Sequence, residues 1–184
     1  MKKILLSLTI LGITALAACA PLKVDQMPSR TPRDFLLDIK AVADSDDLTN
    51  VGAVARRLRI DLVAGPEKPV YGNDGQTLLG YGIDVKQRGI AKEYRPENFW
   101  YRIFRPTDRN FGKALISMSV NKNVICVTRS DLVEIFGEGR RYINPHISSL
   151  DYSYENARNG RIVNFRFEQA GCLFNFGFSD NSEK

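Results

Sequence analysis

Residue types that carry hydrolytic chemistry are scarce in this chain of 184 residues, which contains one histidine, His146, and three cysteines. A Ser–His or Cys–His mechanism needs the imidazole beside a nucleophile, and no Gly-x-Ser-x-Gly turn is present to expose a serine. One histidine cannot hold a catalytic zinc ion without several carboxylates. We therefore expect no catalytic residue, no metal site and no cofactor, and we expect His146 to lie at the surface in a loop.

Paired carboxylates could cleave glycans, but most acidic residues fall in expected helix caps and turns. The scattered ones, such as Glu93, Glu97 and Glu168, form no recognisable pair. An enzyme acting on peptidoglycan or lipid is therefore only the third function that we consider.

The start of the chain has the pattern of a secretory signal peptide. Lys2 and Lys3 form a short basic region, and an almost unbroken apolar run follows over residues 4–16. A run of this length is too short to span a bilayer, and the small residues after it are typical of a cleavage site. We expect residues 1–18 to be removed on export.

The end of this signal, Leu16-Ala17-Ala18-Cys19, resembles the lipobox of bacterial lipoproteins. The resemblance implies cleavage before Cys19, a thioether from its sulfur to diacylglycerol, and acylation of the new amino terminus, for example with palmitate. Ala20 follows, where Asp would imply retention at the inner membrane, so the resemblance implies transfer to the outer membrane. The alternative is an ordinary signal peptide followed by an incidental cysteine.

Three regions are expected along the chain: the signal at 1–18, the lipidated Cys19 with a tether over 19–31, and a single periplasmic domain over 32–184. The mature chain is long enough to bury a sizeable core. The formal net charge of +5 falls to +3 when Lys2 and Lys3 are removed. So small a charge does not indicate a nucleic-acid binder, and export makes nucleic acid an improbable partner.

Once Cys19 is assigned to lipid, Cys126 and Cys172 are the remaining cysteines. Two thiols in an oxidising periplasm have one possible intrachain pairing, and we expect this disulfide. It would stabilise the fold by about 4 kcal/mol through loop closure. The alternative is two buried free thiols.

Capping residues predict three helices. Thr31 precedes Pro32 and an apolar stripe that ends near residue 43, and Thr49 is expected to cap a second helix that reaches Leu58. Thr128 opens a short third helix with a capping box, and Gly137 ends it.

Alternating apolar residues and turn signals predict the strands. Val163, Phe165 and Phe167 are expected to point one way, and so are Cys172, Phe174, Phe176 and Phe178 in the last strand. The expected fold is α+β, with two N-terminal helices and one inserted helix packed on one face of an antiparallel sheet. The expected strands cover residues 60–63, an irregular hairpin over 70–85, and 99–105, 113–120, 150–155, 161–168 and 172–178.

A long polar loop is expected over residues 138–149, and it contains the most interface-like patch of the sequence. Arg140, Arg141 and Tyr142 are adjacent there, and Arg and Tyr are favoured as binding anchors. Such a cluster could meet an acidic protein or phospholipid headgroups. The alternative is a solvated edge without a partner.

Two family resemblances bear on function. The segment from Val127 to Gly137, followed by three strands, resembles the Thr-x-x-x-hydrophobic helix ending in Gly of small outer-membrane assembly lipoproteins of the SmpA/OmlA (BamE-like) type. It departs from them at Glu138, where proline is usual, and in its long upstream domain. The lipobox, the expected disulfide and the lack of a catalytic constellation resemble periplasmic immunity lipoproteins against toxins of type VI secretion.

We therefore expect a lipoprotein anchored to the outer membrane through Cys19, whose periplasmic domain binds another protein without catalysis. Immunity or inhibition of a periplasm-acting toxin is the first hypothesis. An accessory role in outer-membrane or envelope assembly is the alternative.

Overall fold

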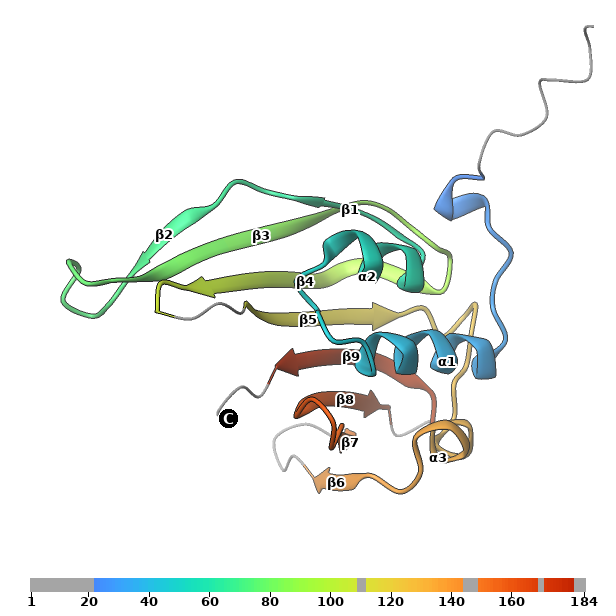
Figure 1. The fold of residues 1–184 in the computed structure, drawn as a ribbon. Coiled ribbons are helices and arrows are strands. Elements are labelled where there is room, and N and C mark those ends of the chain that lie inside the picture. Colours follow the sequence, from blue (N-terminus) through green and yellow to red (C-terminus); the bar gives the residue numbers. More distant parts are fainter. Residues whose placement is uncertain (1–21, 109–111, 144–148, 169–170, 181–184) are drawn as a thin grey trace, which may run out of the picture.

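The structure, a computed structural model, describes residues 22–108, 112–143, 149–168 and 171–180. Within these ranges the chain forms one antiparallel sheet of nine strands and three α-helices, which confirms the α+β class (Figure 1). No helix in the described ranges is both long enough and apolar enough to cross a membrane. Cys19 and His146 lie outside the described residues.

The three α-helices are α1 (Pro32–Ala43), α2 (Val51–Leu58) and α3 (Arg129–Phe136). The Thr31 hydroxyl caps α1 by accepting the Asp34 N–H, and Thr128 and Asp131 form the expected capping box of α3. The prediction that Thr49 caps α2 is wrong. The side chain of Asn50 accepts the N–H of Ala53 at 3.0 Å, whereas Thr49 binds Asp47.

Eight of the nine strands follow the order β1-β3-β4-β5-β9-β8-β7-β6, and the ninth, β2, pairs with β3 on the same side as β1. The last strand in the chain therefore lies between β5 and β8, near the centre of the sheet. The strands are β1 (Ile60–Ala64), β2 (Lys68–Tyr71), β3 (Leu78–Ile90), β4 (Tyr94–Pro106), β5 (Lys113–Val120), β6 (Arg140–Ile143), β7 (Leu150–Glu155), β8 (Arg161–Phe167) and β9 (Leu173–Asp180).

Aromatic rings join the helices to one face of the sheet. Phe35 of α1 meets Phe176 of β9 edge to face at 5.9 Å between centroids, and Phe136 of α3 meets Phe165 of β8 at 4.9 Å. Phe165 and Phe176 are cross-strand partners and so point to the same face. Because α1 also packs against α2 and α3, the helices gather on this face, as Figure 1 shows for α1 and α2.

Two sequence expectations fail in the C-terminal half. Residues 140–143 were expected in a loop but form the strand β6, which pairs with β7 from Arg140↔Ser153 to Ile143↔Leu150. In β9, Leu173 lies opposite Phe167 while Asn175 lies opposite Arg166, so Phe174 is the extra residue of a β-bulge. Phe174 is therefore only half-buried, and Leu173 is buried in its place.

The disulfide is confirmed in the structure. Cys126 and Cys172 are joined across a Cα–Cα distance of 5.1 Å. The bond ties the segment that leads into α3 to the segment that leads into β9. Beside it, the N–H of Leu173 donates to the carbonyl of Val127 at 2.9 Å.

The segment before α1, which the sequence assigned to a tether, packs on the domain where it is described. Its 3-10 turn, η1 (Val24–Gln26), contacts β3, and Arg30 is 6% exposed. The Arg30 guanidinium donates to Glu93 at 3.0 Å and to Asp38 and the Tyr94 hydroxyl at 2.9 Å each. The domain therefore includes residues before Pro32.

Electrostatics favour the charged forms inside this network. Burial alone would raise the pKa of Glu93, but hydrogen bonds from the Arg30 backbone, its own backbone and the guanidinium outweigh burial and lower it. Burial alone would likewise lower the pKa of Arg30, and the facing Tyr94, Asp38 and Glu93 raise it. Burial raises the pKa of Tyr94 to about 12, so its hydroxyl is protonated at neutral pH.

Candidate functional site

The predicted patch lies on β6, the last strand in the sheet order. In the described part of the chain β6 pairs only with β7, so its other side is an open edge. Arg140 and Arg141 are exposed, and the Tyr142 side chain is 54% exposed. Open edges with free backbone donors and acceptors can accept an added strand from a partner.

The structure divides this patch between the two faces of the sheet. Arg140 lies opposite Ser153 and Tyr142 opposite Asp151, so these two side chains share a face. Arg141 lies opposite Tyr152, which is buried on the helix-covered face. Neither Arg140 nor Arg141 forms an ion pair with a residue that the structure describes. Both guanidinium groups are therefore available to an acidic partner.

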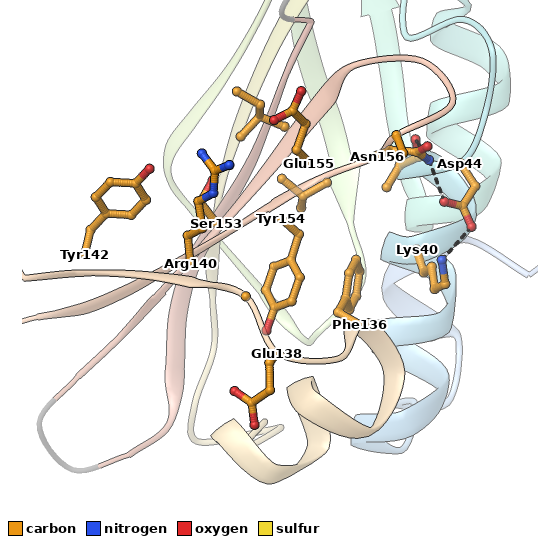
Figure 2. A pocket seen from close by; sticks show the side chains of 15 residues that line it. Lys40, Asp44, Phe136, Glu138, Arg140, Tyr142, Ser153, Tyr154, Glu155 and Asn156 are labelled. Carbon is orange, nitrogen blue, oxygen red and sulfur yellow. Dashed lines mark hydrogen bonds and ion pairs between the residues drawn. The ribbon is translucent and has the colours of Figure 1, made fainter.

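An open hollow of about 770 Å³ lies beside the segment that connects α3 to β6 (Figure 2). Arg140 and Tyr142 line it together with side chains from α1, α3, β7, β8 and the adjoining loops. Within it, Asp44 is already bound, because Lys40 donates to it at 2.8 Å and Asn156 also at 2.8 Å. The labelled lining residues are Lys40, Asp44, Phe136, Glu138, Arg140, Tyr142, Ser153, Tyr154, Glu155 and Asn156.

Tyr154 supplies the aromatic wall of this hollow. Its ring lies between Phe136 at 5.2 Å and Phe165 at 5.7 Å, and it points toward Glu138 (Figure 2). Burial, followed by the charge of Glu138, raises the pKa of Tyr154 to about 12. Its hydroxyl is buried and stays protonated at neutral pH, and it lies beside the backbone N–H of Gly139 without donating a hydrogen bond to a described residue. It is thus a donor that a bound acceptor could satisfy.

A second feature, which sequence reasoning missed, is the sheet face opposite the helices. Trp100 of β4 is 46% exposed and Leu115 of β5 is 39% exposed, and both point to this face because their neighbours Tyr101 and Ile116 are buried. The strand over residues 99–105 was predicted, but its alternation did not say which face the helices leave open. Exposed large apolar side chains on an uncovered face are typical of interfaces.

One cross-strand row links Trp100 to Arg140 on this face. Five strand spacings separate these two residues, a span of about 24 Å at the usual spacing between strands. Between these two residues the row has only small or short polar side chains. The row runs Trp100, Ser117, Gly177, Asn164, Ser153 and Arg140.

We call this row with Tyr142 and Leu115 the open face. On this face Tyr142 lies opposite Asp151, which forms an ion pair with Arg166 at 3.2 Å. The described side chains of the open face and of the hollow offer aromatic rings, amides and guanidinium groups, which suit recognition of another macromolecule. Within the described residues, no three His, Cys, Asp or Glu side chains lie close enough together to hold a metal ion.

Comparisons with known proteins do not extend this description. No protein-family model matches the chain, and neither the curated proteins nor the solved structures contain a significant match.

Proposed function

We propose that the mature protein is a lipoprotein of the outer membrane, anchored at Cys19, whose periplasmic domain binds another protein and inhibits it. An immunity role against a toxin that acts in the periplasm is the form of inhibition that we favour. The observation that carries this proposal is the open face, the sheet surface opposite the helices, which ends at β6, an edge strand within the described residues. It presents Trp100, Tyr142 and Arg140 to a partner, and Arg140 forms no ion pair with a described residue.

The residue types of this surface indicate the chemistry of the partner. Trp, Tyr and Arg are the side chains that most often dominate binding energy at protein interfaces. Arg140 and Arg141 lack ion-pair partners in the described structure, so a partner with an acidic surface would be complementary. A strand of that partner could also pair with β6, because the backbone of an edge strand is free to accept one.

Affinity capture of the full lipidated protein, followed by mass spectrometry, tests this proposal. We expect one specific protein to be recovered, and its recovery to fall at least about thirtyfold in the double variant R140E/Y142A, since interface anchors each contribute about 2 kcal/mol or more. The matched control is Y71A, because Tyr71 on β2 is 51% exposed and Tyr142 is 54% exposed. Equal recovery from the double variant and the control would refute binding at the open face.

Genetics separates inhibition from the alternatives. For an immunity protein, deletion should harm cells only beside attacking cells or with the cognate toxin present. Deletion that weakens the outer membrane by itself, with capture of a barrel-assembly complex, would favour the accessory role instead. Turnover of peptidoglycan or lipid by the purified protein would overturn the non-catalytic proposal.

The anchor has its own test. We expect C19S to release the protein from membranes, because the acyl chains that hold it would be absent. A C19S protein that stays in the membrane fraction would refute the lipidation site.

A further inference from the structure

A basic surface surrounds the point where the described chain begins. An open hollow of about 750 Å³ lies between the first described residues, the C-terminal end of α2 and the end of β3. Its lining contains four basic side chains, Lys23, Arg56, Arg59 and Arg88, and two acidic ones, Asp25 and Asp61. We call this surface the basic collar.

Most of the basic side chains of the basic collar are exposed to solvent. Lys23, Arg56 and Arg88 are exposed, and none of them forms an ion pair with a described residue. Arg59 is half-buried and donates to the carbonyl of Pro28 at 3.1 Å, so it holds the N-terminal segment in place. Leu22, which is 61% exposed, adds an apolar side chain at the same point.

The segment that carries the basic collar is fixed to the domain. Arg30 is held inside by Glu93, Asp38 and Tyr94, as described above. Upstream of it, Val24 lies close to Gly89 of β3, where a side chain on the glycine would come within 3.2 Å of the valine methyl group. Rotation of the domain about this segment would break these contacts.

Chain length then sets the orientation. Only Ala20 and Pro21 stand between Cys19 and Leu22, and three residue steps reach at most about 11 Å. If Cys19 carries the acyl chains, the surface around Leu22 therefore lies within about 11 Å of the lipid headgroups. That distance is close to the Debye length of about 8 Å at physiological salt, so the charges of the basic collar act on the membrane.

We propose that the basic collar binds the anionic headgroups of the phospholipid leaflet and orients the domain on the membrane. This inference rests on the proposed lipid anchor and adds to it a fixed orientation. It also places the β6 end of the open face, with Arg140 and Tyr142, away from the bilayer. The collar lies at β3 and β1, whereas β6 is at the other end of the sheet order, and Figure 1 shows them at opposite ends of the molecule.

Lysine footprinting of the full lipidated protein in vesicles tests this orientation. We compare vesicles of phosphatidylcholine with vesicles of phosphatidylethanolamine and phosphatidylglycerol, and measure acylation of Lys23 by a water-soluble reagent. The reference within the same molecule is Lys68, an exposed lysine of β2. Because each basic residue near an anionic surface strengthens attraction about fivefold, we expect Lys23 labelling to fall about fivefold or more with phosphatidylglycerol, and Lys68 labelling to stay constant.

Charge reversal supplies the matched variants. R56E/R88E should restore Lys23 labelling in phosphatidylglycerol vesicles, whereas R158E, at an exposed arginine of the turn between β7 and β8, should leave the protection intact. Equal protection of Lys23 in both kinds of vesicle, or no protection in either, would refute the binding of anionic headgroups by the basic collar.

The mass of the mature protein shows, independently of the labelling, whether the protein carries acyl chains. Acylated protein without phosphatidylglycerol-dependent protection contradicts the basic collar alone. Protein without acyl chains contradicts the anchor, and with it the orientation proposed here.

Discussion

Replacement of Arg30 by methionine should destabilise the protein strongly. The change keeps an apolar side chain of similar length and removes the guanidinium. This group donates hydrogen bonds to Glu93, Asp38 and Tyr94. It also packs over the ring of Phe35, at 4.8 Å from the ring centroid. The side chains of Arg30 and Glu93 are each 1% exposed, so the carboxylate would be left buried without its cation. Backbone donation from Arg30 to Glu93 at 2.9 Å would persist.

The expected loss is about 3–5 kcal/mol, the usual cost of removing one partner of a buried ion pair. For a domain of this size, the slope of unfolding free energy against urea is about 2 kcal/mol/M, so the midpoint should fall by about 2 M. Far-UV circular dichroism during urea titration measures this shift.

The pH dependence provides a second check. The pKa of Glu93 is lowered in the folded protein, so its contribution is present above the ordinary glutamate pKa and is lost as pH falls through the folded value. In R30M, burial without the cation should raise that pKa, and protonation should relieve the cost in acid. The difference in unfolding free energy between wild type and R30M should therefore become smaller as the pH falls from neutral through the ordinary pKa of glutamate.

The matched control is R105M. Arg105 pairs with Glu67 at the surface, where the two side chains are 52% and 47% exposed, and exposed pairs contribute no more than about 1 kcal/mol. If R30M loses no more stability than R105M, the buried network does not hold the N-terminal segment as we argue.

Three further changes test the fold and the hollow. Reduction of the Cys126–Cys172 bond, which closes a separation of 46 residues, should cost about 4 kcal/mol, seen as a lower urea midpoint with reductant; an unchanged midpoint would contradict this. G139A should cost about 1–3 kcal/mol, because the new methyl carbon would lie 2.6 Å from the Tyr154 ring; wild-type thermal stability would show that the ring moves freely. N50A should cost about 1 kcal/mol by loss of the α2 cap, and chemical denaturation that detects no difference would argue against that cap.

Local signals in the sequence were sufficient for the helices and several strands. The Thr31 cap followed by proline and the Thr128 capping box predict α1 and α3, because the groups that satisfy a helix terminus lie within three residues of one another. Alternation over residues 113–120 predicts β5 with its observed bounds. The pairing of Cys126 with Cys172 followed from two assumptions, that Cys19 is used for lipid and that the compartment is oxidising.

The sequence was insufficient wherever the stabilising partner is distant. The segment from Arg140 to Ile143 has no alternation of apolar and polar residues. It forms a strand because its backbone pairs with the backbone of β7. The bulge at Phe174 arises from the register between β8 and β9, which no local pattern records. Likewise, Arg30 is a charged residue beside prolines and serine, and only the fold surrounds it with Glu93, 63 residues away.

The amino-acid sequence by itself determined the N-terminal caps of α1 and α3, most strands and the α+β class, because these depend on neighbours along the chain. Tertiary structure decided which face of the sheet stays open, which strand forms its edge and how the N-terminal segment is held. These properties depend on strand order, in which β9 lies between β5 and β8. Trp100 and Arg140 are 40 positions apart in the sequence, yet one cross-strand row of the sheet joins them.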